Sequence, residues 1–215
     1  MLKHNNSYVF IDAANIFYGG VKSLHWKIDF AKLFQYLKNQ YNATKVFYYS
    51  GIDTGSYVPE SSDTIDLEEL IKSLESFKKD DNTKPEDITD NENFLTRAKF
   101  YQELQTIGYE LRLKPVKTFT DGEKKVKKAN CDVDLTFDLM RFMSQYTTAV
   151  ILSGDGDFFP ILNYLKKKHK KIKVLARGER TAKEIRKLAA DELIDFGSLK
   201  TELKADNKNP RKGGD

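Results

Sequence analysis

Residues 8–15 read Tyr-Val-Phe-Ile-Asp-Ala-Ala-Asn and carry the first evidence on the class of fold. Tyr8 to Ile11 is an unbroken apolar run, which is typical of a strand that is buried on both faces. Asp12 follows this run directly, and the next periodic segment, Phe30 to Leu37, has the pattern of an amphipathic helix. A buried strand followed by a helix predicts the opening of a βαβ unit.

The alternation of short apolar runs with helical periodicity continues along the chain to about residue 196. Further strands are predicted at 45–49, 109–113, 149–152, 172–175 and 193–196, and further helices at 65–77, 94–107, 132–146, 157–169 and 182–190. Strands separated by helices of this length predict an α/β fold in which a mainly parallel sheet is covered on both faces.

Three polar stretches interrupt this pattern. Residues 53–93 form an insert that holds the acidic helix and an exposed loop at 80–91. A lysine-rich turn is expected before residue 132, and the chain becomes polar again near its end. We therefore predict one domain over residues 1–198, followed by a disordered polar tail over 199–215.

The composition indicates a globular protein with an aromatic-rich core, because the 215 residues include 14 Phe and 11 Tyr. No apolar run approaches the roughly 20 residues that a membrane-spanning helix needs. The first residues also lack the apolar segment of a signal peptide. We therefore expect a cytoplasmic protein that makes no contact with a membrane.

The sequence also limits the metal chemistry. A single cysteine, Cys131, excludes an internal disulfide, and only three histidines accompany it, too few for a Cys/His zinc site. Any bound metal would therefore need oxygen ligands. The net charge of +4 is compatible with a polyanionic partner but does not require one.

Isolated acidic residues follow two of the predicted strands. Asp12 comes directly after Ile11, and Asp155 and Asp157 come after the strand at 149–152. Ligands of a parallel sheet bind at the carboxyl ends of its strands, where adjacent loops diverge. We therefore expect these acids to lie at one edge of the sheet.

A third acidic group begins the helix predicted at 132–146. Asp132 lies at its start, and Asp134 and Asp138 follow. Asp138 borders the apolar face of this helix, where an unpaired carboxylate would cost several kcal/mol. Asp138 therefore needs a partner.

Each acid also has a local interpretation. Asp12 could cap a turn with Asn15, and Asp132 and Asp157 could cap the helices that they begin. Three acidic sites at one edge, however, repel one another unless a cation lies among them. Carboxylates in this number suit Mg²⁺ or Mn²⁺. Asn15 and Ser153 are neutral oxygen donors that could orient a carboxylate or a metal-bound water.

Three spaced motifs recur in a known family. They are Tyr8-Val-Phe-Ile-Asp12-Ala-Ala-Asn15, Lys128-Ala-Asn-Cys-Asp132-Val-Asp-Leu-Thr-Phe-Asp138, and Ser153-Gly-Asp155-Gly-Asp157-Phe. Together they resemble the NYN domain family of PIN-like ribonucleases, including its bacterial LabA branch, and the resemblance covers roughly residues 7–196. It implies a PIN-like three-layer α/β/α sandwich with a central parallel sheet. It also implies an acidic cluster that binds Mg²⁺ or Mn²⁺ for hydrolysis of RNA phosphodiester bonds.

The resemblance assigns roles by position. The catalytic and metal-binding acids are Asp12, Asp132, Asp155 and Asp157, and the supporting residues are Asn15, Ser153, Lys128 and the helical acid Asp138. Two features depart from the family pattern: Ala129 stands where a glycine is usual, and the insert at 53–93 is longer than a minimal domain needs. The insert could select the RNA or pair with another subunit to form a homo-oligomer.

We therefore predict a metal-dependent ribonuclease that acts on single-stranded or flexible RNA. The residues placed to contact substrate phosphates are Lys124, Lys125, Lys127, Lys128 and Arg177. The other interpretation of the lysines is a solvated turn. Phe17, Tyr18 and Phe158 follow the first and last motifs and could stack on bases, although such residues more often belong to the core.

Two other functions compete with this prediction. A binding module could keep the fold and hold RNA or a protein without cutting it, but the intact set of acids argues against that. A phosphatase of the haloacid dehalogenase type needs Asp-x-Asp after the first strand, and Ala14 occupies the second position. No Gly-x-x-x-x-Gly-Lys-Ser/Thr stretch is present, which argues against a phosphate-binding loop.

Overall fold

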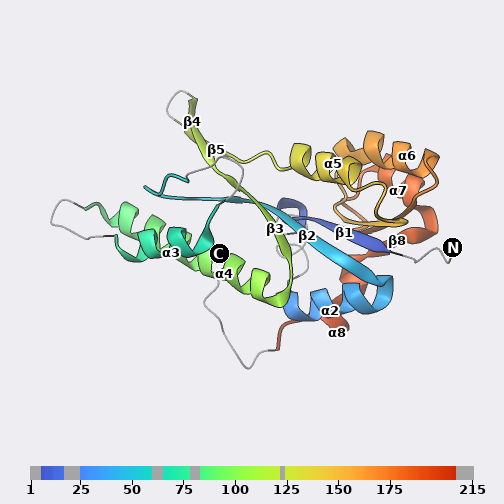
Figure 1. Cartoon of the computed structure of the whole chain (residues 1–215), viewed down its shortest axis with the longest axis horizontal. Helices are drawn as coiled ribbons and strands as arrows, with labels where there is room; N and C mark the ends of the chain where they lie inside the picture. The colour runs from blue at the N-terminus through green and yellow to red at the C-terminus, as the bar shows by residue number, and fades with distance from the viewer. Residues whose placement is uncertain (1–5, 17–24, 60–64, 78–82, 122–123, 207–215) are drawn as a thin grey trace.

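The computed structural model has a central sheet of six parallel strands in the order β3-β2-β1-β6-β7-β8 (Figure 1). Each neighbouring pair in this sheet runs parallel. The strands are β1 (Ser7–Asp12), β2 (Ala43–Ile52), β3 (Glu110–Pro115), β6 (Thr148–Leu152), β7 (Lys171–Ala176) and β8 (Leu193–Asp195). The prediction of an α/β fold with a mainly parallel sheet is confirmed.

The structure describes residues 6–16, 25–59, 65–77, 83–121 and 124–206, and over 118–121 and 124–128 it describes the backbone alone. Within these ranges, no helix combines the length and the apolar character that crossing a membrane requires.

Helices cover both faces of the sheet, which confirms the three-layer α/β/α arrangement (Figure 1). One face carries α2 (Phe30–Tyr41), α3 (Leu67–Glu75), α4 (Pro85–Ile107) and the short α8 (Lys200–Leu203). The other face carries α5 (Asp132–Arg141), α6 (Phe159–Lys167) and α7 (Lys183–Ala189). Each face therefore buries its own hydrophobic core.

Strand β1 shows why the sheet needs two cores. Val9 and Ile11 pack into the core under α2, α3 and α4, whereas Tyr8 and Phe10 pack into the core under α5, α6 and α7. All four side chains are at most 5% exposed. An unbroken apolar run suits this position because successive side chains of a strand point to opposite faces.

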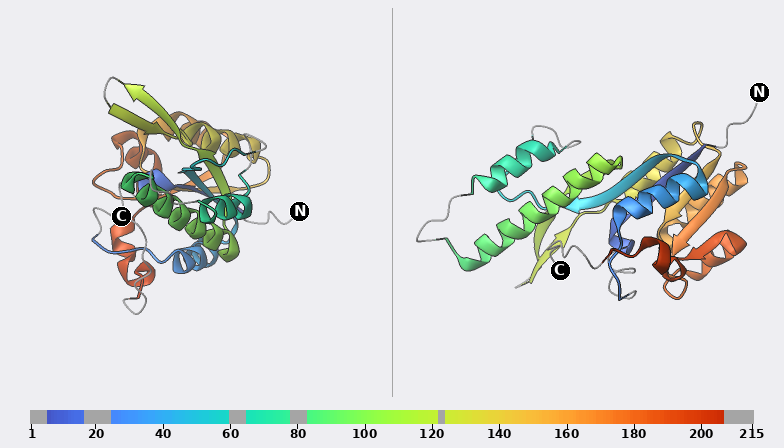
Figure 2. Two further views of the ribbon diagram at one scale, coloured as in Figure 1. Left: turned by 90° about the vertical axis from the view of Figure 1, so that its left-hand side faces the viewer. Right: turned by 90° about the horizontal axis from the view of Figure 1, so that it is seen from below.

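The insert is more helical than the sequence predicts. The expected loop at 80–91 is wrong over its second half, because α4 already begins at Pro85. Proline is tolerated there because the first turn of a helix leaves its N–H groups without helical partners. The Asn91 amide donates to the Leu74 carbonyl oxygen at 3.0 Å, and α3 lies alongside α4 (Figure 2).

The expected lysine-rich turn is instead a β-hairpin. Strands β4 (Lys117–Asp121) and β5 (Lys124–Lys128) pair antiparallel in a separate small sheet. Strand β5 leads directly toward the start of α5. Helix α5 itself ends at Arg141, which is earlier than predicted.

The chain is still folded after residue 199, where the polar tail is expected to begin. Leu203 of α8 is fully buried, and its carbonyl oxygen accepts from the Asp29 N–H at 2.8 Å. The Ala205 N–H donates to the Lys27 carbonyl oxygen at 2.9 Å. Residues 200–206 therefore belong to the folded domain, and the rest of the predicted tail lies outside the described residues.

The order of the strands creates a point of divergence between β1 and β6. From β1 the chain builds the sheet in one direction through β2 and β3, and from β6 it builds in the other direction through β7 and β8. Ile11 pairs with Leu152, so Asp12 and Ser153 come next to each other at the carboxyl edge. Such a switch point is where open parallel sheets form their ligand crevices.

Candidate active site

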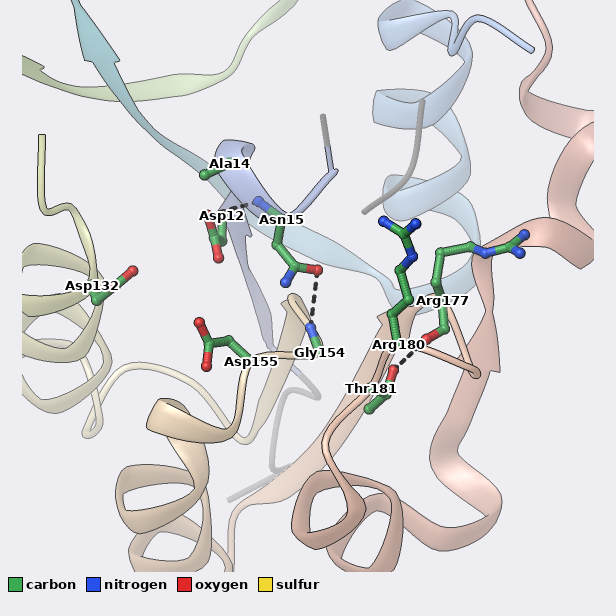
Figure 3. A pocket seen from close by; sticks show the side chains of 9 residues that line it. All are labelled: Asp12, Ala14, Asn15, Asp132, Gly154, Asp155, Arg177, Arg180 and Thr181. Atoms are coloured by element: carbon green, nitrogen blue, oxygen red, sulfur yellow. Dashed lines mark hydrogen bonds between the residues drawn. The ribbon is translucent and has the colours of Figure 1, made fainter. Parts of the chain in front are cut away.

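A cavity of about 350 Å³ opens at this carboxyl edge (Figure 3). It is lined by the last residue of β1, by residues that follow β1, β6 and β7, and by the first residue of α5: Asp12, Ala14, Asn15, Asp132, Gly154, Asp155, Arg177, Arg180 and Thr181. The fold thus brings together acids from all three motifs, which lie far apart in the sequence.

Asp12 is the most deeply buried acid of the cavity, with 8% of its surface exposed. Its Oδ1 accepts from the Asn15 N–H at 3.2 Å, and its Oδ2 accepts from the Ser153 hydroxyl at 3.0 Å. Burial raises the pKa of Asp12; these two hydrogen bonds oppose the shift, and the charges of Asp132 and Asp155 add to it. Asp12 is therefore held in place by neutral donors and destabilised by neighbouring acids.

Asp155 is oriented by the loop that follows β6. Its N–H donates to the Ser153 hydroxyl oxygen at 3.2 Å, and its Oδ1 accepts from the Asp157 N–H at 3.0 Å. Asp155 is thus the cap of the short 3₁₀ helix Gly156–Phe158. The alternative role of Asp157 as a helix cap is wrong, because α6 has Phe158 at its cap position and no side-chain cap bond. The turn cap considered for Asp12 is present.

Asp132 enters the cavity from the first position of α5. It does not cap the helix: the cap position is Cys131, and the Asn130 side-chain oxygen accepts from the Asp132 N–H at 3.0 Å. Partial burial raises the pKa of Asp132, and the charges of Asp155 and Asp157 raise it further. The Asp132 side chain is thus left to face the other acids.

Asn15 joins two of the loops that carry these acids. Its backbone N–H bonds to Asp12, and its side-chain oxygen accepts from the Gly154 N–H at 3.1 Å (Figure 3). The loops after β1 and β6 are thereby connected across the switch point. Asn15 and Ser153 both have the orienting geometry expected of neutral supports.

Two predicted acids lie outside the cavity lining. Asp157 is exposed on the 3₁₀ turn, although its charge still acts on Asp132. Asp138 is 3% exposed and has three partners of its own: the Tyr49 hydroxyl at 3.0 Å, Arg112 Nε at 2.9 Å and Arg141 Nη2 at 3.1 Å. The expected partner for Asp138 exists, and it binds this acid to the core rather than to the cavity.

The predicted phosphate-binding residues have different outcomes. Arg177 lines the cavity. The lysines Lys124, Lys125, Lys127 and Lys128 are on strand β5, but their side chains lie outside the description, so their role stays a prediction. Among the aromatic candidates, Phe158 is 1% exposed and belongs to the core, and Phe17 and Tyr18 lie outside the described residues.

Sequence reasoning missed Arg180 and Thr181, which line the cavity from the loop after β7. The rule that located the acids could have found them, because this loop also follows the carboxyl end of a parallel strand. A charged loop without an isolated acid has the pattern of an ordinary solvated connection, so residue type alone does not mark Arg180 and Thr181 as site residues.

The cavity suits a hard divalent cation by its donor chemistry. Within the described ranges, no three Asp, Glu, His or Cys side chains already converge on one point as a formed metal site. Asp12, Asp132 and Asp155 nevertheless line one cavity, and burial together with the charges of neighbouring acids raises the pKa values of Asp12 and Asp132. Carboxylate oxygens are the ligands that Mg²⁺ and Mn²⁺ take, and a cation among them would relieve this repulsion.

Comparison with known proteins gives three findings. A family model described as NYN domain matches residues 6–200. The low amplitude and bright protein LabA of Synechococcus elongatus is 32% identical over 105 residues, which are 47% of this chain and 56% of that protein. The match thus spans about half the length of this curated relative. A crystal structure of a protein of unknown function from Vibrio parahaemolyticus is similar with a TM-score of 0.60 at 17% identity, covering 94% of this chain and 98% of that one.

Proposed function

Because the chain belongs to the NYN domain family, which relates it to nuclease-like domains with RNA-related functions, we propose that it is a metal-dependent ribonuclease. The reaction is hydrolysis of RNA phosphodiester bonds at the cavity between β1 and β6. The observation that supports this proposal is the meeting of Asp12, Asp132 and Asp155, from three separate segments, in one cavity. Carboxylates that repel one another in this way are typical of a site for a divalent cation.

Three carboxylates would hold the metal ion: Asp12, Asp132 and Asp155. Asp157 would add negative charge at the margin, since it is exposed but acts on Asp132. Bound Mg²⁺ or Mn²⁺ would lower the pKa of a water molecule and stabilise the charge that develops on the phosphate.

The chain's own contribution is to hold the carboxylates in fixed orientations. Each oxygen of Asp12 accepts one hydrogen bond, from Asn15 or from Ser153, so the carboxylate cannot rotate without breaking one of them. Asp155 is held by its capping bond to the Asp157 N–H. A site that is organised in advance loses less free energy when substrate and metal bind.

The substrate that we propose is single-stranded or flexible RNA. Arg177 lines the same cavity as the acids, and its guanidinium would bind a phosphate group. Strand β5 carries four lysines just before α5 in the sequence, and they would attract the RNA backbone.

The test is cleavage of a labelled single-stranded RNA in Mn²⁺, in Mg²⁺ and in chelator. The parent protein is compared with Asp12→Asn and Asp155→Asn, and with Asp191→Asn as a matched control. Asp191 is exposed and does not line the cavity, so its substitution removes the same charge away from the site. We expect metal-dependent cutting by the parent and the control, and a loss of more than about 100-fold in both site variants.

Equal cutting by Asp155→Asn and the parent would show that the site is wrongly placed. Binding of RNA by the parent without cutting in either metal would favour the other function, a module that holds RNA through the same fold.

A further inference from the structure

The cavity has two walls of opposite charge. Figure 3 shows the three carboxylates on one side and Arg177 and Arg180 on the other, with Asn15 between them. Burial raises the pKa of Asp12 and Asp132, and the charges of neighbouring carboxylates raise it further, so the members of the acidic wall repel one another.

The arginine wall is a closed turn rather than a loose loop. The Arg177 carbonyl oxygen accepts from the Arg180 N–H at 3.0 Å, from the Thr181 N–H at 2.9 Å and from the Thr181 hydroxyl at 2.7 Å. These bonds hold the backbone of both arginines in one conformation. Both side chains thus start from a fixed position at the carboxyl end of β7.

Gly154 joins the arginine wall to the acidic wall. The Ala182 N–H donates to the Gly154 carbonyl oxygen at 2.9 Å, and Thr181 is packed against Gly154 with only 2% of its surface exposed. A Cβ atom on Gly154 would lie 2.8 Å from Thr181 Oγ1 and 3.0 Å from Thr181 Cα, so the close approach requires glycine. The spacing between Asp155 and the arginines is therefore set by this contact.

The two arginines differ in their surroundings. Arg180 is exposed, so its guanidinium can meet a ligand that enters from solvent. Arg177 is half-buried and borders a second, much smaller cavity with Ile16, Leu175 and Phe196. Its Nε is buried without a hydrogen-bond partner among the described residues, which leaves one donor of this side chain to be satisfied.

We propose that Arg180, with Arg177 behind it, binds the RNA phosphate that neighbours the phosphate held at the carboxylates. This inference rests on the proposed ribonuclease function and assigns Arg180 the role of a substrate anchor. Guanidinium groups form paired hydrogen bonds with phosphate oxygens, and a carboxylate wall would otherwise repel the RNA backbone. The strand of RNA then passes from the arginine wall to the acidic wall, with its scissile bond over Asp12, Asp132 and Asp155.

The direct test is binding of a labelled single-stranded RNA in chelator, where no metal-dependent cleavage competes, at several salt concentrations. The variants are Arg180→Ala, Arg180→Lys and the matched control Arg186→Ala. Arg186 is also exposed and lies on the neighbouring helix α7, but it does not line the cavity. Because Arg180 and Arg186 are exposed, none of the three substitutions should unfold the protein, and urea denaturation checks this.

We expect Arg180→Ala to weaken RNA binding about 5- to 20-fold, and the slope of log affinity against log salt to fall by about 0.7. Arg180→Lys should recover part of the affinity, because lysine keeps the charge but not the paired hydrogen bonds. Arg186→Ala should bind as the parent does. If Arg180→Ala and Arg186→Ala bind RNA equally well, the anchor is not Arg180.

Cleavage measurements separate this inference from the function on which it rests. With metal present, Arg180→Ala should raise KM by the same factor as it weakens binding, with kcat near that of the parent. A fall in kcat with unchanged KM would overturn the anchoring role. Absence of cleavage by the parent would overturn the ribonuclease proposal, and the binding comparison in chelator would still decide whether Arg180 holds RNA.

Discussion

Helix α5 carries two carboxylates that look alike in the sequence and have opposite surroundings. Asp138 is almost fully buried, with Arg112 and Arg141 within 3.1 Å and the Tyr49 hydroxyl at 3.0 Å. Asp132 faces a cavity, and burial followed by the charges of Asp155 and Asp157 raises its pKa. One acid is paired with two arginines, whereas the charged groups that act on the other are carboxylates.

We infer that this difference separates a structural acid from one that would hold a cation. A buried carboxylate with positive partners stabilises the packing of the helix, and removing it would leave those partners uncompensated. A group of carboxylates that repel one another makes the fold less stable, and a ligand of positive charge would offset that repulsion. The two acids of α5 should therefore respond to the same substitution in opposite ways.

The largest effect is expected at Asp132. Asp132→Asn should reduce metal-dependent RNA cleavage by more than about 100-fold, because it removes one of the three carboxylates that would hold the ion. The free energy of unfolding in chelator should not fall. The assay uses labelled RNA with Mn²⁺, and Asp138→Asn in the same assay should retain most of its cleavage at a temperature where it is folded.

The next effect is expected on stability at Asp138. Asp138→Asn should lower the free energy of unfolding by about 2 kcal/mol, because Arg112 and Arg141 lose their charged partner. Both arginine side chains are partly exposed, at 32% and 47%, so solvent limits the loss.

Urea denaturation measures this loss, with Asp134→Asn as the control on the same helix. Asp134 pairs with Lys114 near the surface, so its substitution should cost less than about 0.5 kcal/mol. If Asp138→Asn had the urea midpoint of the parent and also lost cleavage, Asp138 would belong to the site, and the distinction between Asp138 and Asp132 would be wrong.

The next effect is expected on cleavage, from a substitution at the close contact between Gly154 and Thr181. Gly154→Ala places a Cβ atom against the backbone of Thr181, so the arginine turn must shift relative to Asp155. We expect cleavage to fall about 10-fold, since small displacements of positioning groups reduce rates strongly. Gly178→Ala is the control because its Cβ would meet only the movable side chain of Asp195. Equal activities for these two variants would show that the contact at Gly154 does not set the site.

The smallest effect concerns the free energy of unfolding without metal. Burial and neighbouring acids raise the pKa of Asp12 above its ordinary value of 3.8, so the folded state binds this proton more tightly than the unfolded state. Stability from this group is therefore lost as the pH rises through the raised pKa, and it is fully present below 3.8.

Asp12→Asn removes the buried charge, so in chelator at pH 7 it should stabilise the protein by about 1 kcal/mol, and the gain should shrink as the pH falls. Added Mn²⁺ should stabilise the parent and not this variant. Thermal unfolding with and without Mn²⁺ measures both effects. A variant that is less stable than the parent at pH 7 would mean that Asp12 is mainly a turn cap.

Much of the fold could be predicted because its signals are local. Unbroken apolar runs such as Tyr8 to Ile11 identify strands buried on both faces. For the helix that begins at Pro85, the sequence predicts only the part from residue 94 onward. Its first turns are polar and are stabilised by the neighbouring helix α3 rather than by an apolar stripe of their own. The short helix that contains Leu203 was missed because it packs through few residues at the end of a polar stretch.

The candidate site was predicted to a similar extent. The rule that ligands bind at the carboxyl ends of parallel strands selected Asp12 and Asp155, and the cavity contains both. The same rule did not reveal that Asp157 would lie outside the cavity lining or that Arg180 would be part of it. Residue type and spacing define which side chains can bind a metal or a phosphate, but they do not define which charges become neighbours.

The sequence by itself therefore determined the parallel α/β architecture, the segments that carry the acids and the need of Asp138 for a partner. Only the tertiary structure decided that β1 and β6 lie side by side, that Asp138 is paired with arginines, and that Arg177 and Arg180 line the same cavity as the carboxylates. The physical reason is the separation along the chain over which each effect acts. Burial patterns and helix signals act between residues close in the chain, whereas electrostatic environments arise from segments that only the assembled sheet brings together.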